Sequence, residues 1–382
     1  MFRSSDVRRV ISLALLGGWP LLARAGDLNP PPGPITSTMK TLSQVEPRTP
    51  IGADTTPGGG SVLYRITQPG SYYLTGNIST NLTAVEIAAS HVTLDLMGFD
   101  IAGAGASDGV RAAEGVENIV VRNGTVRNFG DGIDLSDATN KRIENVTAAG
   151  NASFGITAGS GASIVNCTLR NNSFIGVMAQ GGAILTNCTA IDNPNIGFFV
   201  DGAVVNGCLV TGSPNFGIFS FGESTFSGCS LIGNGQGMFA GTRSVISNCT
   251  ASSNDLDGIV TSAGSTIIGC TAAGNGGDGF EVAGDCVVLN SNASGNGTAG
   301  LTSSRAGIRV NSLGERTRID GNNITGNVTG IEIQSAGNLV VRNSASGNSM
   351  ANFMIVVGNT VGPIVNAGNI GTSDRPHANY DY

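Results

Sequence analysis

The chain has 382 residues, of which 58 are glycine and 12% are charged, and its formal net charge is −7. The acidic excess argues against nucleic acids and anionic lipid surfaces as partners, because these attract basic proteins. The high glycine content argues against a mainly helical fold, because glycine destabilises helix interiors.

Residues 1–25 have the organisation of a secretory signal peptide. Three arginines precede an apolar run from Val10 to Ala23, and Ala23-Arg24-Ala25 fits a small-x-small cleavage site. The run is short and interrupted for a membrane-spanning helix, although a retained anchor is the alternative. Cleavage would remove four Arg and one Asp, leaving 16 basic and 26 acidic residues and a net charge of −10. We therefore expect a secreted, periplasmic or cell-surface protein with no membrane segment after cleavage.

Residues 26–61 are rich in proline, threonine and glycine, which is typical of a linker. Within them, Ser37 to Glu46 is compatible with one short helix that Pro47 would end. From Val62 to Phe99 we expect strands that close the first coil of a repeat fold, since the end of such a fold otherwise exposes unpaired strand edges.

A repeat of about 21 residues organises the rest of the chain. Six cysteines recur at gaps of 20 or 21 residues: Cys167, Cys188, Cys208, Cys229, Cys249 and Cys270. An asparagine ladder keeps step with them, with Ser213 filling its one gap: Asn151, Asn172, Asn193, Asn234, Asn254, Asn275 and Asn296. A glycine followed by an apolar residue recurs at the same period. Apolar residues two positions after each cysteine indicate strands, and stacking of such short units indicates a solenoid.

The repeat unit, apolar-x-Asn-[Cys/Asn]-Thr followed by Asn and Gly-Ile, resembles the right-handed parallel β-helix repeat of the pectate-lyase-like superfamily. Residues 38–51, 69–77 and 92–99 resemble an uncharacterised secreted bacterial branch of it. The resemblance implies an all-β, single-stranded, right-handed parallel β-helix over residues 62–372, with an N-terminal cap and a C-terminal tail at 373–382. We count about 13 coils between Val85 and Val357. The superfamily contains lyases, hydrolases, epimerases and binding proteins, so the fold leaves the function open.

The ladder cysteines are expected to be free thiols that point into the core. A disulfide between coils is the first alternative, because export permits oxidation and neighbouring coils lie close enough. A string of soft metal ions is the second.

Acidic residues form the main candidate for chemistry. Alignment of the coils places Asp257 above Asp278, with Asp255 and Glu281 close by. Asp255, Asp257 and Asp278 could bind Ca²⁺, the only cofactor that the sequence suggests. Asp257, Asp278 and Glu281 could instead act as acid and base on a glycosidic bond, as such clusters do in the superfamily. However, no Arg, Lys or His lies at a matching offset, and a solvated turn is the simpler interpretation.

Two further charged groups are weaker candidates. Asp131, Asp134 and Asp137 lie several coils away from the first cluster. Near residues 298–318 one repeat is about ten residues longer, and it carries four arginines that could hold an anionic ligand. A tolerated insertion is the alternative. These arginines are Arg305, Arg309, Arg316 and Arg318.

The second residue after each repeated glycine is expected to face outward, because the first is apolar throughout. In the middle of the chain this position is large and apolar. The predicted ligand or partner face consists of Met178, Phe199, Phe219 and Phe239, with Phe221 beside them. The chain's own terminal segments, a protein partner or a carbohydrate could cover it.

These features favour a secreted, non-catalytic β-helix protein that acts in binding or cell-surface structure through its solenoid face. The alternative is a polysaccharide-active lyase or glycoside hydrolase. A convergent set of charged groups in a groove would separate the two, and the sequence offers carboxylates without a basic partner.

Overall fold

The computed structural model describes residues 47–300, 305–369 and 374–382. The predicted signal peptide and the possible helix at 37–46 lie outside the described residues. Within the described ranges every regular element is a strand, and no helix has the length and hydrophobicity needed to cross a membrane.

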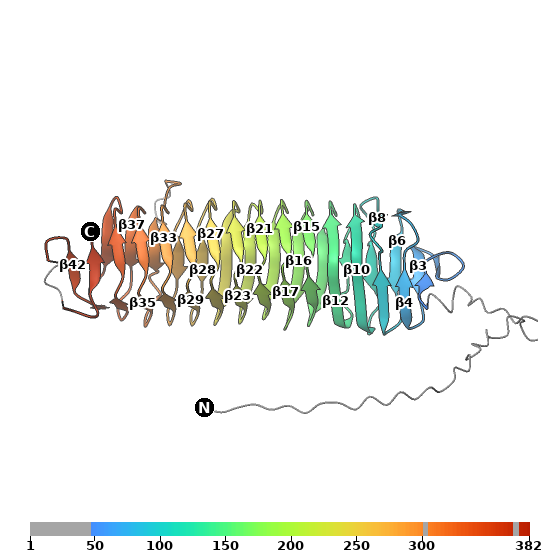
Figure 1. Ribbon diagram of the computed structural model, residues 1–382, viewed down its shortest axis with the longest axis horizontal. Coiled ribbons are helices and arrows are strands. Elements are labelled where there is room, and N and C mark those ends of the chain that lie inside the picture. Colours follow the sequence, from blue (N-terminus) through green and yellow to red (C-terminus); the bar gives the residue numbers. More distant parts are fainter. Residues whose placement is uncertain (1–46, 301–304, 370–373) are drawn as a thin grey trace, which may run out of the picture. The chain divides into compact units, whose positions relative to one another are not determined.

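The first side of the solenoid is a 15-stranded sheet in which successive coils pair in parallel (Figure 1). Only its first pair, β2 with β3, is antiparallel, and this hairpin begins the sheet. The strands are β2 (Pro57–Gly59), β3 (Val62–Ile66), β6 (Thr83–Ile87), β9 (Val110–Ala112), β11 (Ile133–Asp134), β13 (Phe154–Ser160), β16 (Ile175–Gln180), β19 (Ile196–Asp201), β22 (Phe216–Gly222), β25 (Gln236–Thr242), β28 (Ile259–Thr261), β31 (Phe280–Val282), β34 (Ala306–Val310), β37 (Thr329–Ile333) and β40 (Ala351–Ile355).

A 28-stranded sheet forms the other two sides of each coil. Its two columns of strands are joined by β10 (Glu117–Arg127) and β12 (Thr139–Ala149), which run across both. The first column contains β1 (Thr49–Pro50), β4 (Gly70–Tyr73), β7 (Val92–Asp95), β14 (Ser163–Val165), β17 (Ile184–Thr186), β20 (Val204–Asn206), β23 (Thr225–Ser227), β26 (Val245–Ser247), β29 (Thr266–Ile268), β32 (Val287–Leu289), β35 (Arg318–Asp320), β38 (Leu339–Val341) and β41 (Thr360–Val361). The second contains β5 (Ile78–Ser79), β8 (Asp100–Ala102), β15 (Thr168–Arg170), β18 (Thr189–Ile191), β21 (Leu209–Thr211), β24 (Ser230–Ile232), β27 (Thr250–Ser252), β30 (Thr271–Ala273), β33 (Asn292–Ser294), β36 (Asn323–Thr325), β39 (Ser344–Ser346), β42 (Ile364–Asn366) and β43 (Asn379–Asp381).

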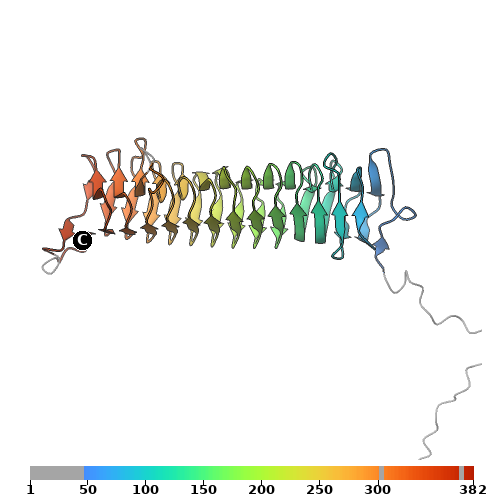
Figure 2. The same ribbon diagram turned by 90° about the horizontal axis from the view of Figure 1, so that it is seen from above.

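The all-β parallel solenoid predicted from the repeat is confirmed, and the coils of the described unit stack along one axis (Figure 2). The solenoid has about 15 turns, whereas the sequence count gave 13. Part of the difference lies at the N-terminal end. Counting began at Val85 in β6, but β3 already pairs in parallel register with β6 and so belongs to the stack. At the other end, the expected C-terminal tail finishes in β43, which pairs with β39 and β42.

A left-handed backbone turn separates the two columns of the 28-stranded sheet in each regular coil. The residue before each ladder cysteine has positive φ, for example 53° at Asn166 and 61° at Gly207. Glycine and asparagine tolerate this region best, which explains why every residue at this position is one of these two types. The turn fixes the corner and points the next residue, the cysteine, into the core.

The core is a stack of small and branched side chains with a few large phenylalanines, such as Phe198, Phe226 and Phe280. All six ladder cysteines are buried, as predicted, and the seven cysteines of the chain form no disulfide in the structure. The Cys188 backbone N–H lies 3.4 Å from the Cys208 sulfur, so each thiol faces the backbone of the preceding coil.

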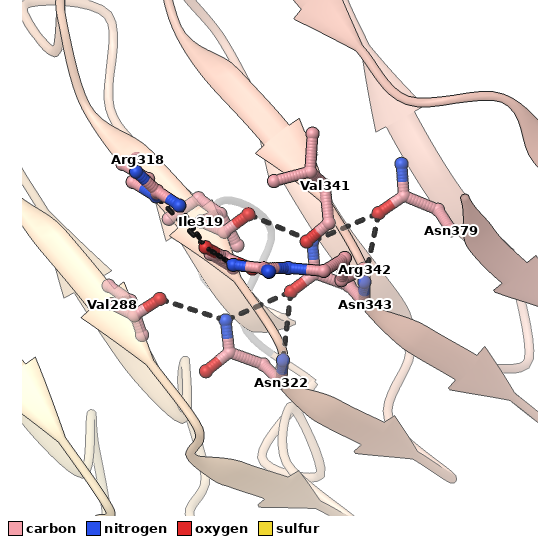
Figure 3. A network of polar contacts seen from close by, with 9 residues as sticks. Val288, Arg318, Ile319, Asn322, Val341, Arg342, Asn343 and Asn379 are labelled. Carbon is pink, nitrogen blue, oxygen red and sulfur yellow. Dashed lines mark hydrogen bonds and ion pairs between the residues drawn. The ribbon is translucent and has the colours of Figure 1, made fainter. Parts of the chain in front are cut away.

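Further along, serine and asparagine replace cysteine in the same column. The Ser291 N–H donates to Asn322 Oδ1 at 2.9 Å, and the amides of Asn322, Asn343 and Asn379 then bond in sequence (Figure 3). Beside this column, the buried Asp320 carboxylate forms ion pairs with both Arg318 and Arg342. A hydrogen bond from Arg342 and a second from Arg318 lower the pKa of Asp320.

The asparagine ladder predicted from the sequence satisfies its own amides. Asn254 Oδ1 accepts bonds from the Asn234 backbone N–H at 2.9 Å and from the Asn234 amide at 3.2 Å. The Asn254 amide in turn donates to Leu231 O at 3.2 Å and to Asn275 Oδ1 at 2.8 Å. Because these groups are buried, each rung holds one corner of the coil in place.

We predict that Asn254→Ala lowers the free energy of unfolding by about 1–3 kcal/mol, because it removes the acceptor of the buried Asn234 N–H and a donor to the Leu231 carbonyl. Urea unfolding followed by circular dichroism measures the change. Asn215→Ala is the control: Asn215 is exposed and its amide makes one bond, to Asn195 at 3.0 Å. Equal losses in the two variants would contradict the structural role of the ladder.

Candidate functional site

One outward-facing row crosses the 15-stranded sheet with one residue from each coil, and we call it the outward row. Because the coils pair in register, neighbours in the row are about 4.8 Å apart along the solenoid. In chain order the row contains Arg65, Glu86, Arg111, Asp134, Thr157, Met178, Phe199, Phe219, Phe239, Val260, Glu281, Arg309, Glu332 and Met354. The row is therefore charged toward both ends and apolar in the middle.

The middle of the row is a set of stacked aromatic rings. The ring centroids of Phe199 and Phe219 are 5.6 Å apart at 17°, and those of Phe219 and Phe239 are 5.2 Å apart at 14°. Phe221 meets Phe219 edge-on at 5.1 Å, and Phe216 does the same from the other side at 5.1 Å. Offset stacking and edge-to-face contacts are the favourable arrangements of aromatic pairs. We call these five residues the aromatic patch.

The structure places the predicted face residues together, since Met178 lies next to Phe199 in the row. The row phenylalanines are half-buried by their neighbours, and Phe221 is 61% exposed. Sequence reasoning missed Phe216, which lies directly before the repeated glycine rather than two residues after it. The signal that could have identified it is an apolar residue directly before the repeated glycine, which recurs at Ile196.

Glycine fixes the direction in which the patch points. A side chain on Gly217 would come within 2.5 Å of the Gly237 carbonyl oxygen, and one on Gly237 within 2.3 Å of the Gly258 oxygen. Neither position can accommodate a Cβ without moving backbone. The chain therefore enters each strand at glycine, the next residue fills the core, and the phenylalanine faces out.

Ion pairs line the N-terminal part of the row. Glu86 contacts Arg65, and its Oε1 accepts a bond from Arg111 Nη2 at 2.7 Å. Asp134 accepts bonds from the backbone and side chain of Ser136 at 2.9 and 2.7 Å. Of the acidic group predicted here, Asp131 is partly buried and Asp137 is exposed. Burial raises the pKa of Asp131.

The C-terminal part contains the main acidic cluster, and here the expectation of carboxylates without a basic partner is wrong. Arg309 Nη2 lies 2.6 Å from Asp278 Oδ2 and 2.8 Å from Glu281 Oε2. The longer repeat hid this pairing. Arg309 is 28 residues after Glu281 rather than 21, yet β34 returns to register and places the two side by side. A fixed repeat length could not find this partner.

The carboxylates sit differently from the predicted metal set. Oxygen atoms of Asp257, Asp278 and Glu281 lie within 4.8 Å of one another, whereas Asp255 is exposed and lies outside this group. The Arg309 guanidinium already contacts two of the three carboxylates and supplies the positive charge that a Ca²⁺ ion would bring. The geometry therefore fits an arginine-centred cluster better than a calcium site with six or more oxygen ligands.

Asp278 is the most unusual acid of the cluster, because its side chain is completely buried. Burial raises the pKa of Asp278 to about 8, and the opposing effect of Arg309 is smaller. One oxygen accepts a bond from the Ala306 N–H at 2.6 Å. Burial also raises the pKa of Asp257, whose Oδ1 accepts a 2.6 Å bond from the Asp278 N–H.

A pocket of about 400 Å³ borders the cluster on its C-terminal side. It is lined by Arg305, Arg309, Thr329, Glu332, Gln334, Met350 and Met354. The other arginines of the longer repeat turn elsewhere: Arg316 pairs with Asp285 at 2.7 Å, and Arg318 pairs with Asp320. The structure thus divides the four arginines between this pocket and local ion pairs.

We predict a pH dependence of stability from Asp278. Its pKa of about 8 exceeds that of an unfolded aspartate, roughly 3.9, so the folded state keeps a proton that the unfolded state loses between these values. The resulting stability is complete below about pH 4 and is lost as the pH rises to about 8. At about 1.4 kcal/mol per pKa unit, this is a fall of up to about 6 kcal/mol.

Asp278→Asn should remove this slope, because an amide stays neutral at every pH. Urea unfolding at intervals from pH 4 to pH 8 tests it, with Asp137→Asn at an exposed aspartate as the control. Parallel curves for the wild type and Asp278→Asn would show that Asp278 is ionised in the folded protein at neutral pH.

Comparisons with known proteins agree with this architecture. A family model described as right handed beta helix region matches residues 108–244. Two solved A-modules of mannuronan C-5 epimerases from Azotobacter vinelandii are each 18% identical to the chain. For AlgE4 the likeness covers 81% of this chain and 90% of that chain, with a TM-score of 0.52. For AlgE6 it covers 77% and 91%, with a TM-score of 0.55.

Pectate lyase Pel9A is also 18% identical, over 53% of this chain and 66% of its own, with a TM-score of 0.40. A comparison with curated proteins finds none that matches. At these identities the epimerase modules show a shared fold and nothing about activity. Together with the family model, they confirm the right-handed winding that the repeat resemblance implied. The chain is a right-handed parallel β-helix with the pectate-lyase-like fold.

Proposed function

We propose that this chain is an exported β-helix protein that binds a protein partner through the aromatic patch and catalyses no reaction. The observation that carries the proposal is the stack of Phe199, Phe219 and Phe239 on the outer side of the sheet, with Phe221 exposed beside it. Covering a large apolar side chain is worth roughly 1.5–3 kcal/mol, so a contiguous aromatic surface marks an interaction site.

The composition of the face favours a protein over a sugar. Sugar platforms commonly use Trp or Tyr, but the only tryptophan, Trp19, lies in the predicted signal peptide, and the outward row contains no tyrosine. An apolar centre with charged groups around it is the usual anatomy of a protein interface. The described C-terminal strand β43 pairs in the other sheet, so those residues do not cover the patch.

A polysaccharide-active enzyme is the second candidate, because Asp257, Asp278 and Glu281 converge with Arg309 next to a pocket. The fold likeness to mannuronan C-5 epimerase modules is consistent with this second candidate. A catalytic acid must come within hydrogen-bond distance of its substrate. Asp278 is completely buried and the Arg309 side chain is 9% exposed, so the groups that would perform the chemistry have little access to a polymer. These contacts favour a structural role for the cluster.

We predict that the patch is covered in cells that export the protein. Hydroxyl-radical footprinting should oxidise Phe199, Phe219 and Phe239 several-fold less in those cells than in dilute purified protein, because the partner excludes water. Phe174, which is 46% exposed outside the patch, is the internal control and should react equally in both samples. Equal oxidation of the patch in both samples would rule out the proposed face.

We predict no release of unsaturated or reducing ends from pectin or alginate, and no epimerisation of mannuronan, by the mature chain. The physical reason is the buried position of Asp278 together with the net charge of −10, which repels acidic polymers. Product assays by ultraviolet absorbance, reducing-end chemistry and NMR measure these activities. Turnover that disappears in Glu281→Gln, with an unchanged melting temperature, would establish the enzyme instead.

A further inference from the structure

The outward row is complementary to itself when its order is reversed about Phe219. We propose that the partner of the aromatic patch is a second copy of this chain. In this homodimer two 15-stranded sheets pack face to face with their solenoids antiparallel, about a two-fold axis that runs along β22 at Phe219. The inference rests on the proposed function, because it names the partner of the same face. An isologous dimer of this kind requires a patch that matches itself.

The apolar residues match first. Reversal about Phe219 places the Phe219 ring opposite its own copy, and Phe199 opposite Phe239 of the second copy. One coil further out, Met178 faces Val260. Every large apolar group in the middle of the row then meets another apolar group, and Phe221 beside the row also meets its own copy. The arrangement buries the whole aromatic patch.

The charges match next, in the outer coils. Asp134 faces the pocket that Arg305 and Arg309 of the second copy share, beside the Arg309 guanidinium that also contacts Asp278 and Glu281 of its own copy. Arg111 faces Glu332. Asp134 accepts hydrogen bonds from Ser136 and interacts with the Lys141 ammonium, and Glu332 accepts a hydrogen bond from Gln334, so the dimer would add an arginine beside each of these carboxylates. The two-fold axis repeats each pair, giving four contacts between opposite charges.

The same charges exclude the other ways of packing the face. Parallel solenoids would place each residue opposite its own copy, so Arg111 would face Arg111 and Glu332 would face Glu332. An antiparallel axis shifted by half a coil toward Phe199 would place Arg111 opposite Arg309, and a shift toward Phe239 would place Asp134 opposite Glu332. An axis at Phe199 would place Asp134 opposite Val260. Facing like charges destabilise an interface, and an unpaired buried carboxylate costs more.

The face is long enough for a stable dimer. Arg111 to Glu332 spans eleven coils, roughly 50 Å at about 4.8 Å per coil, and the strands expose a strip roughly 15 Å wide. The strip is roughly 750 Å² on each copy, close to the roughly 800 Å² per partner of a standard protein interface.

Light scattering and sedimentation of the mature chain over a range of concentrations test the association. The wild type should be a dimer. Glu332→Arg places an arginine opposite Arg111 at both symmetry-related contacts and should weaken dimerisation at least tenfold. The double variant Arg111→Glu with Glu332→Arg should restore most of the affinity. Glu117→Arg is the matched control, since Glu117 is exposed and lies in β10 of the other sheet. Melting curves check that each variant is folded. A wild type that stays monomeric at every concentration would overturn the dimer.

Nitroxide labels on single introduced cysteines test the direction of packing. The native cysteines are at most 2% exposed, so Ala263→Cys and Ala336→Cys on exposed turns can be labelled selectively. In the antiparallel dimer the two labels are four coils apart for Ala263→Cys and ten coils apart for Ala336→Cys, roughly 19 and 48 Å along the solenoid. Equal distances for the two sites would overturn the antiparallel arrangement.

Different results would overturn the binding face and the homodimer. If footprinting finds the patch covered in cells while the purified wild type stays monomeric, the binding face stands and the second copy is not its occupant. If the combined Phe199→Ser, Phe219→Ser and Phe239→Ser variant dimerises as the wild type does, the patch is not the interface and the homodimer proposal fails.

Discussion

In-register stacking of the coils is the constraint on which the rest of this structure depends. The backbone N–H groups of the strands bond to carbonyl groups of the neighbouring coils, so equivalent positions lie about 4.8 Å apart from one end to the other. A residue type placed at one position must tolerate its own neighbours above and below. Asparagines meet this condition because each amide both donates and accepts, as Asn254 does with Asn234 and Asn275. Buried thiols meet it because they are small and nearly apolar.

The same constraint arranges outward positions in continuous rows, so that side chains in one row interact with one another. Three phenylalanines in successive coils stack their rings, so each gains a neighbour on both sides before any partner arrives. Charges in one row must alternate to avoid repulsion, which is what Arg65, Glu86 and Arg111 do. The order of charges along the row differs from one end to the other. A second molecule that binds the row must therefore present complementary charges in one direction and in one register.

The parts of the fold that the sequence predicted are those that repeat with a fixed length. The strands, the inward cysteines, the asparagine ladder and the outward position of Phe199, Phe219 and Phe239 follow from a period of about 21 residues. The contact between Arg309 and Glu281 could not be predicted in this way, because the longer repeat breaks the period while the strand pairing continues across it. Phe216 was missed for a different reason. It sits at a corner, where alternation along a strand no longer tells which way a side chain points. The full burial of Asp278 was equally hidden, since it depends on the same longer repeat, through the bond to Ala306.

A tryptophan at the centre of the aromatic patch tests most directly whether a second copy of this chain covers the patch. Residues 26–382 contain no tryptophan, so in a chain produced without the predicted signal peptide Phe219→Trp reports on this one position. Fluorescence quenching by acrylamide would be measured over a dilution series of the purified mature chain. A dimer would give a blue-shifted emission that is poorly quenched at high concentration and becomes red-shifted and readily quenched once dilution dissociates it. Emission that is red-shifted and readily quenched at every concentration would contradict the dimer.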